Sequence, residues 1–164
     1  MPSSHWIAVV AAALSACLLG GLWYSPLGFH ESWKAAAQLS DAQLRGVGLS
    51  KQKSSYLKDL SAKTAGGQLD FAKLPEMADD EVIAHLTQVK GIGVWTAHMF
   101  LMFSLRRPNV LPTGDYGIQM AMKKLYKKRK LPKPKDMEKI AKPWEPYRSV
   151  ACWYLWRALD IKTL

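Results

Sequence analysis

The sequence predicts an all-α fold, and three observations predict it. From Leu39 onward, apolar residues recur every three or four positions, which is the period of one face of a helix. Glycine and proline residues separate these stretches, and no segment alternates strictly between apolar and polar residues as a half-buried strand does. With 164 residues, of which 49% are apolar, the chain can bury one core and is expected to form one domain or a small pair.

The N-terminal segment 1–30 differs from the rest of the chain. From Trp6 to Tyr24 it carries no charged residue, and this length is at the edge of what can span a bilayer. Leu14-Ser15-Ala16-Cys17 also resembles a lipoprotein cleavage site. No Lys or Arg precedes the run, so the basic flank of a signal peptide or membrane anchor is missing. This favours a buried helix, or sequence outside the domain, over membrane insertion or export.

Two helices are expected next. Ser40 is a suitable N-cap with Gln43 three residues later, a pattern that closes the first turn of a helix. Gly46 ends this helix. Ser50 can cap the second helix, which Gly66-Gly67 ends.

Segment 79–105 predicts a helical hairpin. An acidic start at Asp79 suits the positive end of a helix, and an apolar helix follows the turn Lys90-Gly91-Ile92-Gly93 at once. The two glycines let the backbone turn sharply and approach another surface closely, while Ile92 packs inward. Free amides at the start of the second helix favour a phosphate oxygen.

A Pro/Gly turn at 112–117 places Asp115 directly before an expected helix from Tyr116 to Tyr126. On spacing alone, this aspartate is explained as a plain N-cap. A last helix carries Trp153, Tyr154 and Trp156. Aromatic residues at this density are usually core, although proteins that bind single strands or flipped bases stack bases on them.

Basic residues are concentrated in the second half of the chain. The formal net charge is +10, and residues 85–164 hold 16 basic and 5 acidic residues against 7 and 8 in residues 1–84. This excess indicates a polyanionic partner, either nucleic acid or an anionic membrane. The stretch Lys123–Lys135 is interpreted as an exposed loop that contacts phosphate, directs nuclear import or is merely solvated.

Cys17 and Cys152 are the two cysteines of the chain. They cannot form a disulfide framework, and with four scattered histidines they do not give the spacing of a zinc site. An iron–sulfur cluster held by cysteines is excluded by count. We therefore expect no cofactor, no metal held by side chains, and a reducing compartment.

Taken together, the Gly91–Gly93 hairpin, the Trp95-Thr96-Ala97 that follows it, the Pro112–Asp115 turn and the Pro146–Trp156 tail resemble the helix-hairpin-helix/Gly-Pro-Asp superfamily of DNA glycosylases. Within it the chain most resembles DNA-3-methyladenine glycosylase II. The resemblance runs from about Leu39 to Asp160 and implies a helix-hairpin-helix glycosylase domain over 31–164.

The resemblance also implies a role for each matching residue. Asp115 matches the catalytic aspartate. The phosphate-binding hairpin is matched by Lys90, Gly91, Gly93 and Thr96, and the base pocket by Trp95, Met99, Tyr116 and Trp156. In some relatives a monovalent cation binds between the hairpin carbonyls, here those of Gly91 and Gly93, and the phosphate.

Trp95 stands where bifunctional relatives carry a nucleophilic lysine, so the resemblance implies a monofunctional enzyme that forms no Schiff base and cuts no strand. The implied reaction hydrolyses the N-glycosidic bond of an alkylated purine, such as 3-methyladenine or 7-methylguanine, in base excision repair. Electron-rich rings would attract the cationic base, and ionised Asp115 would stabilise the sugar cation and guide water.

Upstream of Leu39 the chain departs from the family pattern. Relatives carry a segment with a Gln-Gln motif and a loop that wedges into the DNA, and residues 1–30 do not resemble it. We therefore expect the glycosylase fold to be incomplete at its N-terminus, and the alternative function is a non-catalytic or degenerate helix-hairpin-helix DNA-binding protein. The expected partner is double-stranded DNA with alkylated bases. We expect the protein to act as a monomer with no obligate protein partner. Its expected location is the nucleus in a eukaryote and the cytoplasm otherwise.

Overall fold

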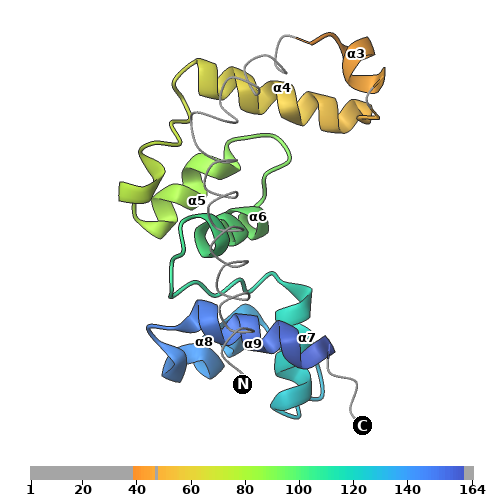
Figure 1. Cartoon of the computed structure of the whole chain (residues 1–164). Coiled ribbons are helices and arrows are strands. Elements are labelled where there is room, and N and C mark those ends of the chain that lie inside the picture. Colours follow the sequence, from red (N-terminus) through yellow and green to blue (C-terminus); the bar gives the residue numbers. More distant parts are fainter. Residues whose placement is uncertain (1–38, 47, 161–164) are drawn as a thin grey trace, which may run out of the picture. The chain divides into compact units, whose positions relative to one another are not determined.

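The computed structural model describes residues 39–46 and 48–160, and its regular elements over these ranges are all helical, as the sequence predicts (Figure 1). The apolar run Trp6–Tyr24 and the boundary at residue 30 lie outside these ranges, so their interpretation stays a prediction. Within the described part of the chain, none of the helices combines the length and apolar character needed to cross a membrane. The chain divides into two compact units, Met1–Gln68 and Leu69–Leu164.

The described part of the first unit consists of two helices, α3 (Asp41–Gly46) and α4 (Lys51–Ala65). The predicted caps are confirmed. The Ser40 amide donates to Gln43 Oε1 at 2.8 Å and the Gln43 amide to Ser40 Oγ at 3.2 Å, while Ser50 Oγ accepts the Lys53 amide at 3.3 Å. Each serine therefore satisfies an amide that a helix start leaves without a partner.

The second unit contains a longer series of short helices. In chain order these are η1 (Leu74–Glu76), α5 (Asp79–Thr87), α6 (Val94–Met99), η2 (Phe100–Ser104), α7 (Tyr116–Leu125), α8 (Pro134–Ala141), η3 (Lys142–Trp144) and α9 (Arg148–Asp160). Helix α5 packs on α6, and α7 packs on α9 (Figure 1). The apolar side chains that these helices bury form the core of the unit, among them Val82, Leu86, Ala97, Leu101, Ile118, Met122, Met137 and Leu155.

The predicted hairpin is formed by α5, the Gly91-Ile92-Gly93 turn and α6. Both glycines are exposed, as expected, but Ile92 is only half-buried and does not join the core. The apolar helix after the turn is not α-helical throughout, because η2 continues α6 as a π-helix from Phe100. A π-turn widens the helix by one residue and often occurs at functional sites.

The connector between η2 and α7 carries Asp115 and is tied down on two sides. The Arg107 guanidinium donates to the carbonyls of Pro75 and Met77, both at 2.8 Å. Ser149 at the start of α9 donates its hydroxyl to the Arg107 carbonyl at 2.6 Å and accepts the Val110 amide at 3.0 Å. These bonds fix the path of the chain that leads into the Asp115 turn.

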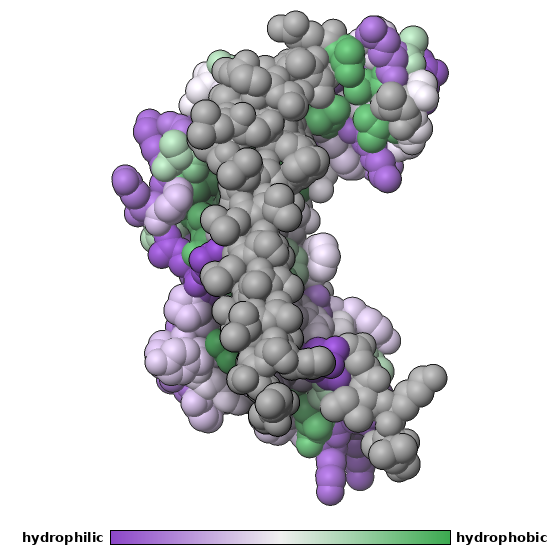
Figure 2. Space-filling model, viewed as in Figure 1, coloured by the Kyte–Doolittle hydropathy of each residue, from purple (hydrophilic) through white to green (hydrophobic). Residues whose placement is uncertain are grey.

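The basic stretch Lys123–Lys135 covers the last turn of α7, a loop and the start of α8. From Lys124 to Lys135 the side chains are exposed except for Pro132. Figure 2 shows hydrophilic side chains gathered at the lower end of this view, where the chain leaves α7. The predicted exposure is confirmed.

Candidate functional site

Asp115 is the N-cap of α7, and its side chain is almost completely buried, with 7% of the residue exposed. Its Oδ1 accepts the Ile118 amide at 2.7 Å. The plain N-cap interpretation therefore describes part of what this residue does. A carboxylate that served only as a cap would need no further partners.

Two tryptophan side chains supply such further partners. Trp95 Nε1 donates to Asp115 Oδ2 at 2.7 Å, and Trp156 Nε1 donates to Asp115 Oδ1 at 3.0 Å. Trp95 lies in the first turn of α6 and Trp156 in α9. Three helices thus converge on one carboxylate from positions 20 and 41 residues away in the sequence.

These contacts decide the ionisation of Asp115. Burial by itself raises the pKa of this carboxyl, but hydrogen bonds from the Ile118 amide, the two indoles and the Gly117 amide outweigh it and hold the pKa below its usual value. All four donors are neutral N–H groups, and their hydrogen bonds favour the charged form of the carboxyl over the protonated form. Asp115 is therefore an ionised, desolvated carboxylate at neutral pH.

Cys152 on α9 is the buried titratable neighbour of Asp115. Burial first, and the negative charge of Asp115 second, raise the pKa of the thiol to about 12, while the Arg148 guanidinium lowers it. The thiol stays protonated and is no nucleophile at neutral pH, because the thiolate is the reactive form.

The other predicted pocket residues flank this centre. Tyr116 follows Asp115 directly and is 65% exposed, and Met99 lies one helical turn after Trp95 and is half-buried. The structure thus brings Asp115, Trp95 and Trp156 together by direct hydrogen bonds and leaves Tyr116 and Met99 beside them.

The residues predicted to hold a phosphate all lie at the hairpin. Gly91 has φ of +84°, a conformation that side chains rarely adopt, while Gly93 is extended and forms the N-cap of α6. Lys90 and Thr96, on either side of the turn, are exposed. Trp95 lies two residues after Gly93 and donates to Asp115, so it connects the hairpin to the carboxylate.

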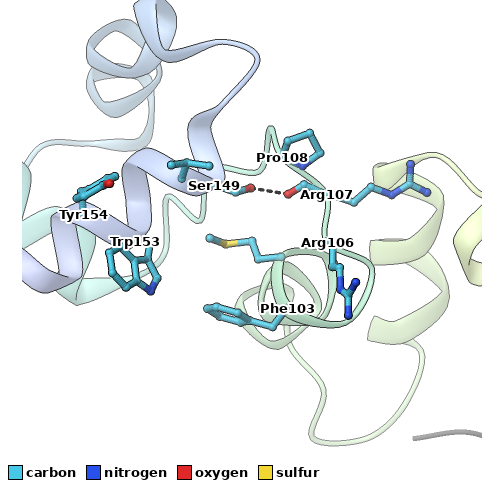
Figure 3. A pocket seen from close by; sticks show the side chains of 9 residues that line it. Phe103, Arg106, Arg107, Pro108, Ser149, Trp153 and Tyr154 are labelled. Carbon is cyan, nitrogen blue, oxygen red and sulfur yellow. Dashed lines mark hydrogen bonds between the residues drawn. The ribbon is translucent and has the colours of Figure 1, made fainter. Parts of the chain in front are cut away.

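Sequence reasoning missed Phe103. Its ring stacks on that of Trp156, with centroids 6.1 Å apart and planes at 28°, and the residue is 59% exposed. Phe103 also lines a shallow hollow between the end of η2 and α9 (Figure 3). In that view Phe103 reaches toward α9, and the guanidinium groups of Arg106 and Arg107 point away from it. The π-helical turn that presents Phe103 has no signal in composition or spacing.

Comparisons with known proteins show the family of this chain. A family model described as "HhH-GPD superfamily base excision DNA repair protein" matches residues 22–146. DNA-3-methyladenine glycosylase 1 of Schizosaccharomyces pombe is 36% identical over 115 residues, which cover 70% of this chain and 50% of the relative. The chain spans about half the length of the curated relatives it matches.

Solved structures give the same result. The 3-methyladenine DNA glycosylase Mag1 of S. pombe, in complex with abasic DNA, superposes with a TM-score of 0.70 at 30% identity, covering 79% of this chain and 64% of that one. The DNA-3-methyladenine glycosidase of Bacillus halodurans gives 0.69 at 42% identity, covering 77% and 58%.

Proposed function

The chain belongs to the HhH-GPD superfamily of base excision DNA repair proteins, and on that premise we propose that it is a monofunctional DNA glycosylase that excises alkylated purines of the 3-methyladenine and 7-methylguanine type. Its partner is double-stranded DNA containing such bases, and a single chain is the acting unit. The named relatives, which are DNA-3-methyladenine glycosylases, support this substrate class.

The observation that carries the proposal is the ionised, indole-bound carboxylate of Asp115. An alkylated purine is cationic or electron-poor and leaves without much protonation, so the enzyme must mainly stabilise the positive charge that develops on the sugar. A fixed, desolvated carboxylate supplies that stabilisation, since electrostatic interactions are strong where water is excluded. Oδ2 has a lone pair beyond the one used by Trp95 and can orient the attacking water.

Base recognition is assigned to the aromatic side chains around this carboxylate. Trp95 is 51% exposed although its N–H is bonded to Asp115, so its ring face is open to a ligand. Stacking of a cationic base on such a face is worth about 0.5–2 kcal/mol. Tyr116 and Trp156 supply further aromatic rings, and Met99 lines the pocket with a flexible, non-aromatic side chain. Flipping the nucleotide out costs a few kcal/mol, least for a weakened base pair.

The hairpin binds the DNA backbone in this proposal. One phosphate is contacted by Lys90, Gly91, Gly93 and Thr96. The carbonyls of Gly91 and Gly93 would hold a monovalent cation there. The Gly93 oxygen accepts the Ala97 amide at 3.0 Å and keeps its second lone pair. Such an ion would add positive charge at the phosphate.

Trp95 excludes one reaction subtype from the proposal. Strand cleavage by these enzymes requires an amine that forms a Schiff base with the sugar. At the position after the hairpin where bifunctional relatives carry a lysine, this chain has an indole whose N–H bonds to Asp115. The product is therefore free base and an intact abasic strand.

Release of radiolabelled 3-methyladenine from alkylated DNA by the purified chain tests the proposal. We expect the wild-type chain to release base and Asp115→Asn to lose at least 100-fold in rate, because the amide cannot supply the negative charge. Asp80→Asn, at the exposed start of α5, is the matched control and should match wild type. DNA binding without base release by the wild-type chain would instead identify a non-catalytic helix-hairpin-helix DNA-binding protein.

A further inference from the structure

We propose that Gly117 and Trp156 are positioning residues for Asp115: the absence of a side chain at Gly117 lets the Trp156 indole reach the carboxylate, and this N–H holds the carboxylate in its reactive orientation. The inference rests on the proposed function, in which Asp115 is catalytic. Trp156 then orients the carboxylate in addition to lining the base pocket. Gly117 then has a role in the site that the sequence did not indicate.

The space around Gly117 carries the argument. A Cβ at this position would lie 3.1 Å from Asp115 Oδ1, 3.1 Å from Trp156 Cδ1 and 3.3 Å from Trp156 Nε1. Ordinary van der Waals contacts between such atoms begin near 3.4 Å. Even one methyl group would therefore require the carboxylate or the indole to move by a few tenths of an ångström, and such a shift disturbs the hydrogen bond between them.

Backbone conformation does not explain a glycine here. Gly117 lies in the first turn of α7, and its φ is not in the left-handed region that favours glycine, unlike Gly48, Gly67 and Gly91. Glycine in a helix costs about 1 kcal/mol relative to alanine. The chain thus carries a locally unfavourable residue at the point where the carboxylate and the indole need the room.

The indole is also held from another side. Phe103 stacks on the Trp156 ring, and α9, which carries Trp156, packs on α7. The ring is therefore confined between Phe103 and the Gly117 backbone, with its N–H directed at Asp115 Oδ1.

A double-mutant cycle in single-turnover base release tests this coupling, with Gly117→Ala, Trp156→Phe and the double variant. Phenylalanine keeps an aromatic ring but lacks the N–H. Trp156→Phe removes a hydrogen bond to a charged group and Gly117→Ala weakens it, so we expect Trp156→Phe to slow the chemical step about tenfold and Gly117→Ala to slow it by no more than that. The double variant should be no slower than Trp156→Phe, because both changes act on the same interaction. DNA affinity, measured by fluorescence anisotropy, should not change in Gly117→Ala.

Nuclear magnetic resonance of the indole N–H groups gives a readout that does not depend on activity. The Trp156 Nε1–H resonance should move upfield in Gly117→Ala as its bond to the carboxylate weakens. Gly114→Ala is the matched control, because a Cβ there meets no heavy atom within 4 Å, and it should leave this resonance in place. Gly117→Ala should remain folded in circular dichroism, because alanine is the better helix former.

The outcomes separate the two proposals. An unmoved Trp156 resonance in Gly117→Ala, or equal slowing by Gly117→Ala in the wild-type and Trp156→Phe backgrounds, overturns the positioning role. If the wild-type chain releases no base, the proposed function fails, and the resonance of Gly117→Ala against Gly114→Ala still decides whether Gly117 sets the contact.

Discussion

At the scale of single residues, the main feature is a buried carboxylate held by neutral hydrogen-bond donors. The donors that lower the pKa of Asp115 are two indole and two backbone N–H groups. A cation beside the carboxylate would stabilise it equally well but would also repel the positive sugar that forms in the reaction. Neutral donors keep the charge in place while leaving its field available to the substrate.

The pH dependence of the reaction follows from the depressed pKa of Asp115. A carboxylate with a lowered pKa remains ionised and active until the pH falls through that lowered value. Its contribution to stability is complete above the ordinary pKa and is lost as the pH falls from there through the lowered value. We expect the acid limb of the base-release rate of wild type to lie below the ordinary carboxyl value of 3.8. Trp95→Phe removes one of the bonds that lower the pKa, so its acid limb should shift to higher pH.

Rate–pH profiles of the two proteins under single-turnover conditions measure this shift. The Cys152 thiol does not contribute to the limb, because its pKa is about 12. Weaker base stacking in Trp95→Phe would lower the whole profile without moving its limb. If the acid limbs of wild type and Trp95→Phe had the same midpoint pH, the role of the Trp95 N–H would be contradicted, whatever the difference in maximal rate.

At the scale of elements, the two glycines of the hairpin have different tasks. Gly91 has positive φ, which costs an L-residue about 1–2 kcal/mol. Gly93 is extended and caps α6, and a Cβ there would meet open space. Gly91 is needed for the fold of the turn, whereas Gly93 leaves room for whatever approaches the turn.

Gly91→Ala and Gly93→Ser should therefore separate folding from binding. We expect Gly91→Ala to lower the free energy of unfolding by about 1–2 kcal/mol. Gly93→Ser should keep or slightly raise it, because serine is a better N-cap than glycine, yet weaken DNA binding. Its side chain fills the approach and takes an amide that a phosphate would use. Urea denaturation and anisotropy with a duplex measure the two effects, and full DNA affinity in Gly93→Ser would contradict phosphate binding at this turn.

Short sequence patterns predicted where the helices begin and end, but they could not predict contacts between residues far apart in the sequence. Helix starts are predicted by Ser40, Ser50 and Asp115, because an N-cap side chain bonds to an amide within three residues of its own position. The π-turn at Phe100–Ser104 could not be foreseen, since it shifts each hydrogen bond by one residue without changing the apolar pattern. The contact of Trp156 with Asp115 depends on how α9 packs on α7, and the sequence alone did not specify that packing.

At the scale of the whole molecule, the charge is concentrated in one stretch. Residues 123–142 hold ten basic and two acidic residues, which is most of the net charge of +10. Its basic residues from Lys124 onward are exposed, and the stretch lies apart in sequence from the hairpin at 90–96. If both contact DNA, several phosphates are neutralised at once, and the affinity must fall steeply as salt rises.

Neutralising two lysines of this stretch tests whether it contributes to DNA binding. Lys128→Gln/Lys130→Gln should lower the affinity for undamaged duplex about tenfold at 0.1 M salt and reduce the slope of log K against log salt by up to about 2. The chemical step should be unchanged, because neither residue contacts Asp115 or the indoles. Lys51→Gln/Lys53→Gln, an equally spaced exposed pair at the start of α4, is the matched control. Equal slopes for the two double variants would show that position does not matter and that the basic stretch is only a solvated surface.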